Sequence, residues 1–328
     1  MERFDAHGHI PADHAESAEF FAAMDLRLVN IAFAHLGGGD WRGEQVWGAA
    51  GLVRAAQGWP ERFAWCTGFD LPRWDDPGWA DAAIRGIDAD FEKGAVAVKV
   101  WKDFGMRLRN PSGAWVQVDD PVLEPVFAHL EKTGRTVLMH VGDSKKHWEP
   151  GMDGDHAMHG KQGAPSNEDI MAARDRVLER HPKLKVIGCH LGCMEDDLGA
   201  IAQRLDRFPN FAVDSSARVM ALAGHDRGKV REFFAKYRDR ILYGADQFSE
   251  KPHSVMTQWE RCKELSYLRF RYLEEFEFYE SGSEMLLQGW ELIPKRIRGL
   301  GLPGDVLDSF YRGNALKWLP ALAGKGRG

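Results

Sequence analysis

The chain has few cysteines and no long hydrophobic run. Its four cysteines, Cys66, Cys189, Cys193 and Cys262, form no paired disulfide framework, and the spacing of Cys189 and Cys193 matches no common zinc site, so we expect these two to be small buried hydrophobic residues. No apolar run approaches the roughly 20 residues that a membrane-spanning helix needs, and no signal peptide is apparent. We therefore expect a reducing, cytoplasmic location and no membrane partner.

Blocks of like charge are also lacking. Charged residues make up 28% of the 328 residues and the formal net charge is -6, which argues against a nucleic-acid partner. A hydrophobic content of 44% over this length is enough for a large core and excludes a disordered or collagen-like chain. This composition is typical of a globular enzyme that acts on a small molecule.

Eight short apolar or β-branched runs alternate with amphipathic stretches that predict helices, such as residues 167–181. This alternation predicts a parallel sheet with helical crossovers, and eight strands are the count of a (β/α)8 TIM-type barrel. A doubly wound sheet would show the same alternation. Polar residues at the ends of the runs favour the barrel, because it brings those ends to one mouth. The runs cover residues 3–7, 27–34, 62–69, 95–101, 135–140, 184–190, 210–214 and 240–245.

Two segments, after the fifth and eighth strands, are longer than ordinary connections. The first, residues 141–166, is rich in histidine and is interpreted as a substrate-covering loop or a solvated excursion. The second is predicted to be an insertion, residues 248–290, within a single domain of residues 1–328. Its aromatic stretch, residues 266–279, fits a helix or a hairpin, and would either cover the barrel mouth or form an oligomer contact, so a homodimer is a candidate assembly.

Four residues at strand ends are candidate ligands of a divalent metal ion. His7 and His9 are two positions apart on the first strand, so both imidazoles face the same side. His140 ends the fifth run, and Asp246 follows the eighth, which neighbours the first in a closed barrel. Zinc is the expected ion, with manganese or another divalent ion as alternatives, and it would activate water whose proton Asp246 accepts.

Four further residues are candidate catalytic or substrate-binding groups. His190 ends the sixth run and would bind a second metal, polarise a carbonyl or transfer a proton. Lys99, inside an apolar run, is interpreted as a carbamylated bridge between two metals, a cation for an anionic substrate, or a structural lysine. Lys102 and Arg218 are candidate cations for a substrate carboxylate, and Lys102 is otherwise a surface lysine.

Four ordered motifs resemble the amidohydrolase superfamily, in particular the branch that includes aminocarboxymuconate semialdehyde decarboxylase and related lactonases and decarboxylases. They are Asp5-Ala-His-Gly-His9, Met139-His140-Val-Gly, Gly188-Cys-His190-Leu-Gly and Tyr243-Gly-Ala-Asp246. Gly313-Asn314-Ala315 also resembles the C-terminal helix signature of that family.

The resemblance implies a distorted (β/α)8 barrel of the metal-dependent hydrolase type, with His7, His9, His140 and Asp246 as ligands. It implies that His190 is an acid–base or electrophilic group. In relatives with two metals, the fourth-strand lysine is carbamylated and the sixth-strand histidine is a ligand, which Lys99 and His190 would match.

Two reactions fit such a site. Hydrolysis of a lactone, ester or amide is the favoured prediction, with Asp246 as proton acceptor. Non-oxidative decarboxylation is the alternative, with Lys99, Lys102 and Arg218 suited to a carboxylated aromatic. A third hypothesis is an inert barrel that only binds a metal. The joint presence of these polar residues at the strand ends argues against it.

Overall fold

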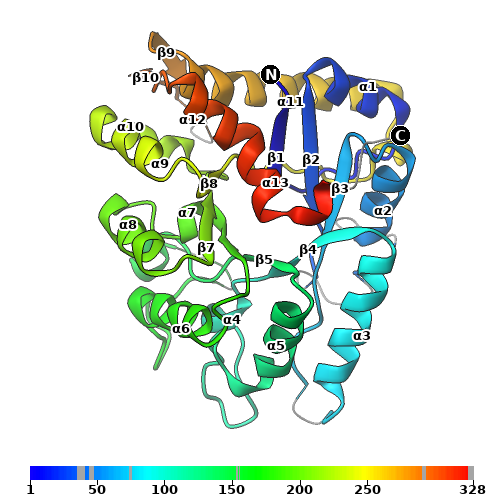
Figure 1. Cartoon of the computed structure of the whole chain (residues 1–328), viewed down its shortest axis with the longest axis vertical. Helices are drawn as coiled ribbons and strands as arrows, with labels where there is room; N and C mark the ends of the chain where they lie inside the picture. Colours follow the sequence, from blue (N-terminus) through cyan, green and yellow to red (C-terminus); the bar gives the residue numbers. More distant parts are fainter. Residues whose placement is uncertain are drawn as a thin grey trace. The chain divides into compact units, whose positions relative to one another are not determined.

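The structure, a computed structural model, describes residues 1–34, 41–43, 48–73, 76–152, 154, 156–289 and 293–323. Eight parallel strands follow one another in sequence order in one sheet, with helices between them, and this is the fold class of a (β/α)8 barrel (Figure 1). The strands are β1 Arg3–Gly8, β2 Leu26–Ile31, β3 Phe63–Thr67, β4 Ala95–Val100, β5 Thr136–Met139, β6 Val186–Gly188, β7 Phe211–Asp214 and β8 Ile241–Leu242.

The larger helices connect these strands or follow them. They are α1 Ala15–Ala23, α2 Ala49–Gly58, α3 Trp79–Glu92, α5 Glu124–Lys132, α6 Asn167–Arg180, α8 Leu198–Arg207, α9 Val219–Gly224, α10 Arg227–Lys236 and α11 Gln258–Glu280. Shorter helical segments are α4 Asp103–Met106, α7 Cys189–Gly192, α12 Gly304–Asp308, α13 Asn314–Trp318, η1 Pro121–Leu123, η2 Lys145–Trp148, η3 His253–Val255, the π-helix η4 Ser309–Gly313 and η5 Pro320–Leu322. An antiparallel hairpin consists of β9 Glu284–Leu287 and β10 Lys295–Arg298.

The contacts divide the chain into two compact units. The first consists of Met1–Phe33, Gly39–Cys66 and Asp214–Gly328, and the second of Ala34–Gly38 and Thr67–Val213. The first unit therefore contains β1, β2, β3 except its last residue, and β8, and the second contains β4, β5, β6 and β7 except its last residue. The predicted single domain and its insertion stay predictions.

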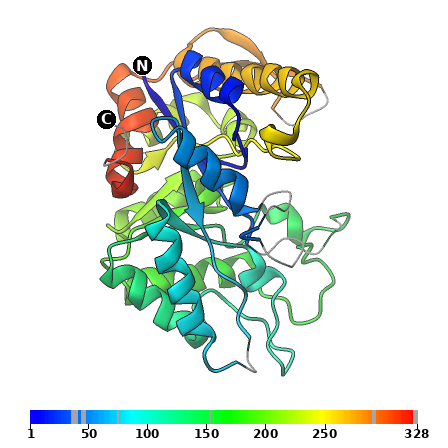
Figure 2. The same ribbon diagram turned by 90° about the vertical axis from the view of Figure 1, so that its right-hand side faces the viewer.

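In the first unit, α11 packs its inner face against an aromatic cluster at the outer side of β1 and β8. A capping box of Thr257 and Glu260 begins this helix of 23 residues. The rings of Phe276 and Tyr243 lie 5.7 Å apart, and those of Tyr279 and Phe310 lie 4.8 Å apart. Helix α1 lies beside α11 (Figure 2). The aromatic residues on this face are therefore core residues of the first unit.

In the second unit, the sheet is a fully buried parallel one. All six residues of β4 are buried, as are those of its neighbour β5, which explains their continuous apolar sequences. Helix α6 begins at a capping box formed by Ser166 and Asp169, and Pro182 follows its end. Its Arg174 is buried, with Nη1 donating to the carbonyl oxygen of Gly192 at 2.7 Å.

The predicted barrel and its eight strands are confirmed, with end positions that differ by a few residues. The helix predicted for residues 167–181 is α6, and residues 304–318 form α12, η4 and α13 in succession. The aromatic stretch that fitted a helix or a hairpin is helical, within α11. Cys189 and Cys193 are buried, as predicted.

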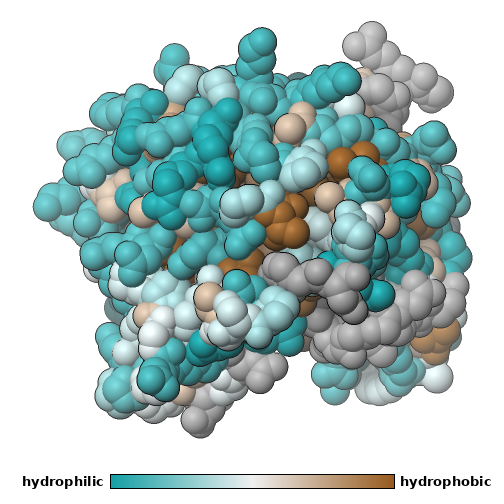
Figure 3. All heavy atoms as spheres, turned by 90° about the horizontal axis from the view of Figure 1, so that it is seen from below, coloured by the Kyte–Doolittle hydropathy of each residue, from teal (hydrophilic) through white to brown (hydrophobic). Residues whose placement is uncertain are grey.

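Among the described residues, no helix is long and apolar enough to span a membrane. Hydrophilic side chains predominate on the face drawn in Figure 3, where the hydrophobic residues form small separate patches.

Candidate metal centre and catalytic groups

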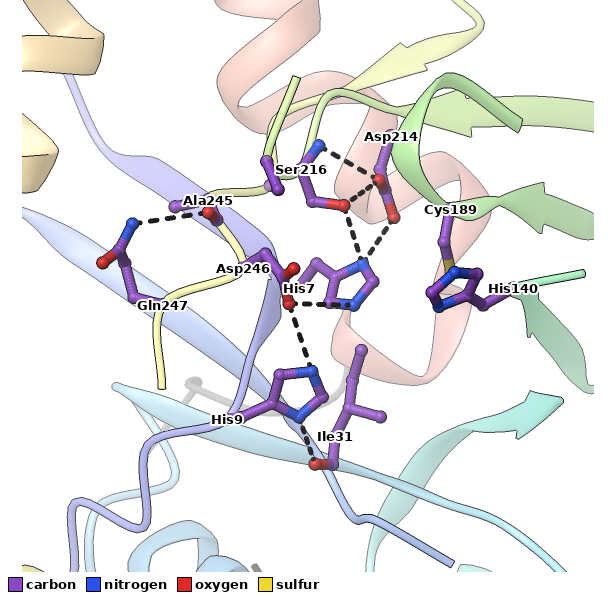
Figure 4. Close-up of polar contacts among 12 residues, drawn as sticks. His7, His9, Ile31, His140, Cys189, Asp214, Ser216, Ala245, Asp246 and Gln247 are labelled. Carbon is purple, nitrogen blue, oxygen red and sulfur yellow. Dashed lines mark hydrogen bonds and ion pairs between the residues drawn. The ribbon is translucent and has the colours of Figure 1, made fainter. Parts of the chain in front are cut away.

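Three of the predicted ligands meet in the first unit. His7 lies near the end of β1, His9 directly follows that strand, and Asp246 follows β8. Asp246 Oδ1 lies 3.6 Å from His7 Nε2 and 3.3 Å from His9 Nε2 (Figure 4). One donor atom from each of the three residues lies within 4.8 Å of the other two. Two imidazole nitrogens and one carboxylate oxygen are a donor set typical of zinc and of other divalent transition metals.

The other nitrogen of each imidazole is held by a hydrogen-bond acceptor. His9 Nδ1 donates to the carbonyl oxygen of Ile31 at 2.8 Å, and His7 Nδ1 donates to Asp214 Oδ2 at 2.9 Å. A carbonyl or carboxylate oxygen only accepts, so the proton of each neutral ring is on Nδ1. The lone pair of each Nε2 therefore faces Asp246 and is available to a metal ion.

Asp214 and Ser216, which orient His7, were not predicted from the sequence. The backbone N–H of Ser216 donates to Asp214 Oδ1 at 3.1 Å, and the Ser216 hydroxyl bonds the same oxygen. Ser216 Oγ also lies 3.0 Å from His7 Nδ1. Asp214 ends a run that was recognised as the seventh strand, so its strand-end position was the signal that could have identified it.

Asp5 connects the two chain segments that supply the ligands. Its Oδ1 accepts the backbone N–H of His7 at 2.9 Å and that of Ala245 at 3.0 Å, and its Oδ2 accepts the Tyr272 hydroxyl at 2.7 Å. Burial raises the pKa of Asp5 to about 7, although these three hydrogen bonds lower it and the charge of Asp246 adds to the rise. Asp5 thus holds the ends of β1 and β8 together behind the candidate metal ligands.

The backbone at Asp246 is in the left-handed region, with φ of +58°. Its N–H donates to the carbonyl oxygen of His7 at 2.7 Å, which fixes this unfavourable conformation. A Cβ atom at neighbouring Gly244 would lie 3.0 Å from the Cβ of His7, so the close approach of this segment to β1 favours glycine there. The side chain of Asp246 is 25% exposed, whereas those of His7 and His9 are 1% and 5% exposed, so solvent reaches the carboxylate.

The other two predicted histidines are neighbours in the second unit. The ring centroids of His140, after β5, and His190, after β6, lie 4.3 Å apart. His190 has a φ of +57°, and a Cβ atom at Gly188, just before it, would lie 2.7 Å from the ring of Phe211. This tight left-handed turn presents His190 at the end of its strand. The prediction that His140 binds the same metal as His7 and His9 stays a prediction.

The predicted cations already have partners. Lys99 is fully buried, with Nζ 3.1 Å from Cys189 Sγ and 4.8 Å from the centre of the Trp101 ring. Lys102 forms an ion pair with Asp143. Arg218, in the first unit, donates from Nη1 to the carbonyl oxygen of Ala217 at 3.2 Å. The structure thus gives each cation a protein partner, and its role toward a substrate stays a prediction.

Two histidines of the segment after β5 each lie near a carboxylate of the second unit. His147 Nε2 lies 3.3 Å from Asp143 Oδ2, and His156 Nε2 lies 3.9 Å from Asp103 Oδ1. Burial and, second to it, the ammonium group of Lys102 together lower the pKa of His156 to about 4. His156 is therefore neutral near pH 7. The segment also contains His159, which is exposed.

Comparison with known proteins identifies the family. A family profile described as amidohydrolase matches residues 4–321. No curated protein matches the chain in sequence. Several solved structures share the fold of this chain at 11 to 14% sequence identity, and at this identity the similarity concerns the fold alone. They include 2,6-dihydroxybenzoate decarboxylase from Rhizobium, with a TM-score of 0.55, 14% identity, and coverage of 98% of this chain and 99% of that one.

Two other solved structures are similar to a comparable degree. 4-Oxalomesaconate hydratase from Rhodopseudomonas palustris has a TM-score of 0.52, 12% identity, and coverage of 98% of this chain and 97% of that one. A putative 2-pyrone-4,6-dicarboxylic acid hydrolase from Pseudomonas putida has a TM-score of 0.51, 11% identity, and coverage of 98% of each chain. Because the family profile covers nearly the whole sequence, the chain belongs to the amidohydrolase family of enzymes.

Proposed function

We propose that this protein is a metal-dependent hydrolase that cleaves a C–O or C–N bond of a small, carboxylated lactone, ester or amide. His7, His9 and Asp246 would hold the ion, for which zinc is proposed and manganese is an alternative. The supporting observation is that both Nε2 atoms face one Asp246 oxygen while both Nδ1 atoms are held by acceptors. Such an arrangement has its donor atoms ready for a divalent ion.

A bound divalent ion lowers the pKa of water and polarises a carbonyl oxygen, which is the chemistry that hydrolysis near pH 7 requires. Asp246 is proposed to accept the proton from water, because its carboxylate is the exposed member of the three. The hydrogen bonds from His7 to Asp214 and from His9 to Ile31 keep the two imidazoles from rotating during this transfer.

His140 and His190 enter the proposal through their sequence motifs. His140 would be a further ligand, and His190 would donate a hydrogen bond to the developing oxyanion or transfer a proton to the leaving group. Their rings contact each other at 4.3 Å, so each restricts the rotation of the other. A two-ion site with a carbamylated Lys99 is not part of the proposal, and would require Lys99 Nζ to move from Cys189 Sγ.

Decarboxylation is the second candidate, because the fold is shared with 2,6-dihydroxybenzoate decarboxylase. That reaction needs cations that hold a substrate carboxylate. Lys102 is paired with Asp143 and Lys99 lies against Cys189, so a substrate carboxylate would have to compete with these partners. The partly exposed base Asp246, in contrast, is suited to activating water. These contacts favour hydrolysis.

The two reactions differ in their products. Zinc-loaded protein would be incubated in ¹⁸O-labelled water with a panel of carboxylated lactones, esters and amides and a panel of hydroxybenzoates, and both ¹⁸O incorporation and CO2 release would be measured. Hydrolysis predicts ¹⁸O in the product and no CO2. Asp246→Asn should lower kcat by roughly 10²–10⁴-fold, whereas Asp239→Asn, a change at an exposed carboxylate, should leave kcat unchanged. Release of CO2 without ¹⁸O incorporation would refute the hydrolase proposal.

The inert-barrel hypothesis is tested by metal content. The protein would be purified without added ions, and its metal compared with that of His7→Ala and His140→Ala. The proposal expects about one divalent ion per chain and a large loss in both variants. A wild-type protein that neither carries nor takes up metal, or a His7→Ala variant that retains it, would contradict the proposed site.

A further inference from the structure

The outer face of α11 is an exposed stripe that the packing of the first unit does not use. Trp259, Lys263, Tyr267, Phe270, Leu273 and Glu277 are spaced three or four residues apart. At about 100° per residue, all six lie within roughly 60° of the direction of Phe270. All six are exposed, so they form one continuous surface, here named the α11 stripe.

This stripe is unusually apolar for a surface. Trp259 is 78% exposed, and Tyr267, Phe270 and Leu273 are each close to half exposed. Together with Phe248 and Val255, just before α11, they are six of the ten large hydrophobic side chains that are exposed among the described residues. The concentration of these side chains along 26 consecutive residues distinguishes the stripe from scattered surface hydrophobics.

The size of the stripe fits a protein interface. With about 150–250 Å² for a whole aromatic side chain, the exposed fractions add up to roughly 500 Å² of apolar surface. A specific interface typically buries about 800 Å² per partner, with an apolar centre and a polar rim. The stripe supplies such a centre, and Lys263 and Glu277 flank it with opposite charges.

We propose that the α11 stripe binds the same stripe of a second copy of this chain, antiparallel and about a two-fold axis at Phe270. This register places Lys263, seven residues before the axis, opposite Glu277 of the second copy, seven residues after it. It also places Tyr267 opposite Leu273. A two-fold interface must match itself, and the charges along the stripe do so.

Trp259, the most exposed residue of the stripe at 78%, lies toward one end of it. It is 11 residues from Phe270, so at 1.5 Å per residue it lies about 16 Å along the helix from the axis. In this register Trp259 faces the C-terminal end of α11 of the second copy, directly after Glu280. The two-fold axis creates this contact twice.

Sedimentation velocity of the full chain over a range of concentrations tests the proposal. The expected species has twice the 37.0 kDa mass of one chain and dissociates on dilution. Phe270→Glu places two carboxylates at the axis and should weaken the dimer roughly a hundredfold. Leu286→Glu, a change of the same kind at an exposed residue of β9, is the matched control and should leave the dimer intact. Circular dichroism would verify that both variants are folded.

Charge exchange and crosslinking test the register. Lys263→Glu or Glu277→Lys alone should weaken the dimer, and the two together in one chain should restore it. In a Cys262→Ser background, Phe270→Cys should form a disulfide-linked dimer under mild oxidation, and Leu286→Cys should not. A protein that stays monomeric up to about 100 µM would overturn the proposal, and the stripe would then be a candidate surface for a partner other than a second copy. A dimer unaffected by Phe270→Glu would overturn it as well.

Discussion

Replacement of Asp214 by asparagine should weaken metal binding without removing any ligand. In the native structure, Asp214 Oδ1 accepts the backbone N–H of Ser216, and Oδ2 accepts the proton on His7 Nδ1. The backbone N–H can only donate, so the oxygen of an asparagine amide will stay beside Ser216 and its NH2 group will face His7. Two donors cannot share a hydrogen bond, and the proton of His7 is therefore expected to move from Nδ1 to Nε2.

A proton on Nε2 occupies the lone pair that would bind the metal. Loss of such an orienting partner typically costs 10- to 100-fold in metal affinity, or about 1.4–2.7 kcal/mol. The His7 and Asp214 side chains are 1% and 0% exposed, so water cannot readily replace the lost acceptor. We therefore expect the loss of metal affinity in Asp214→Asn to be near the upper limit of that range, about a hundredfold.

Competition with a chromophoric chelator would measure the zinc Kd of metal-free wild type, Asp214→Asn and Asp239→Asn at one pH. Ser216→Ala should lose less than Asp214→Asn, because the Ser216 backbone N–H still holds Asp214. The ¹⁵N shifts of His7 would report the tautomer directly. If Asp214→Asn folds normally and binds zinc within twofold of the wild-type Kd, or if its His7 keeps the proton on Nδ1, the reasoning is refuted.

Two other predictions concern stability. Tyr272→Phe should lower the free energy of unfolding by about 1–3 kcal/mol, because it removes a donor from the buried Asp5 carboxylate. Tyr267→Phe, at an exposed tyrosine of the same helix, should change it little, and equal denaturant midpoints for the two variants would contradict this role of Tyr272. Between about pH 6.5 and pH 4 the unfolded chain protonates His156, whereas the folded chain, with a pKa of about 4, keeps it largely neutral. Wild type should therefore lose about 2 kcal/mol more stability than His156→Gln between pH 7 and pH 4.5, and parallel losses in denaturant titrations would exclude this effect.

The barrel could be predicted because its strands are buried on both faces. Parallel strands covered on both sides are continuous apolar runs, as in residues 95–101 and 135–140, and these runs are recognisable without knowledge of the fold. The aromatic segment was ambiguous for a physical reason. Tyr272 and Phe276 face the core while Tyr267 and Phe270 face solvent, so apolar residues on both faces hide the helical period.

The candidate metal ligands could be chosen from the sequence, whereas not all of the groups that orient them could be recognised there. His7, His9 and Asp246 have side chains of the chemistry that a metal requires, at the ends of recognisable strands. The acceptor for His9, in contrast, is the backbone carbonyl of Ile31, and every residue has such a group. Sequence alone therefore contains no signal for it.

The orientation of His9 depends on how β1 and β2 pair. Gly8 is the register partner of Asn30, which places His9 beside the end of β2, where the carbonyl of Ile31 is available. A shift of one residue would turn His9 to the opposite face of the sheet and remove it from Asp246. Because His9 meets Asp246 only when β1 keeps this register with β2, the proposed metal site depends on the strand pairing as well as on the candidate ligand residues.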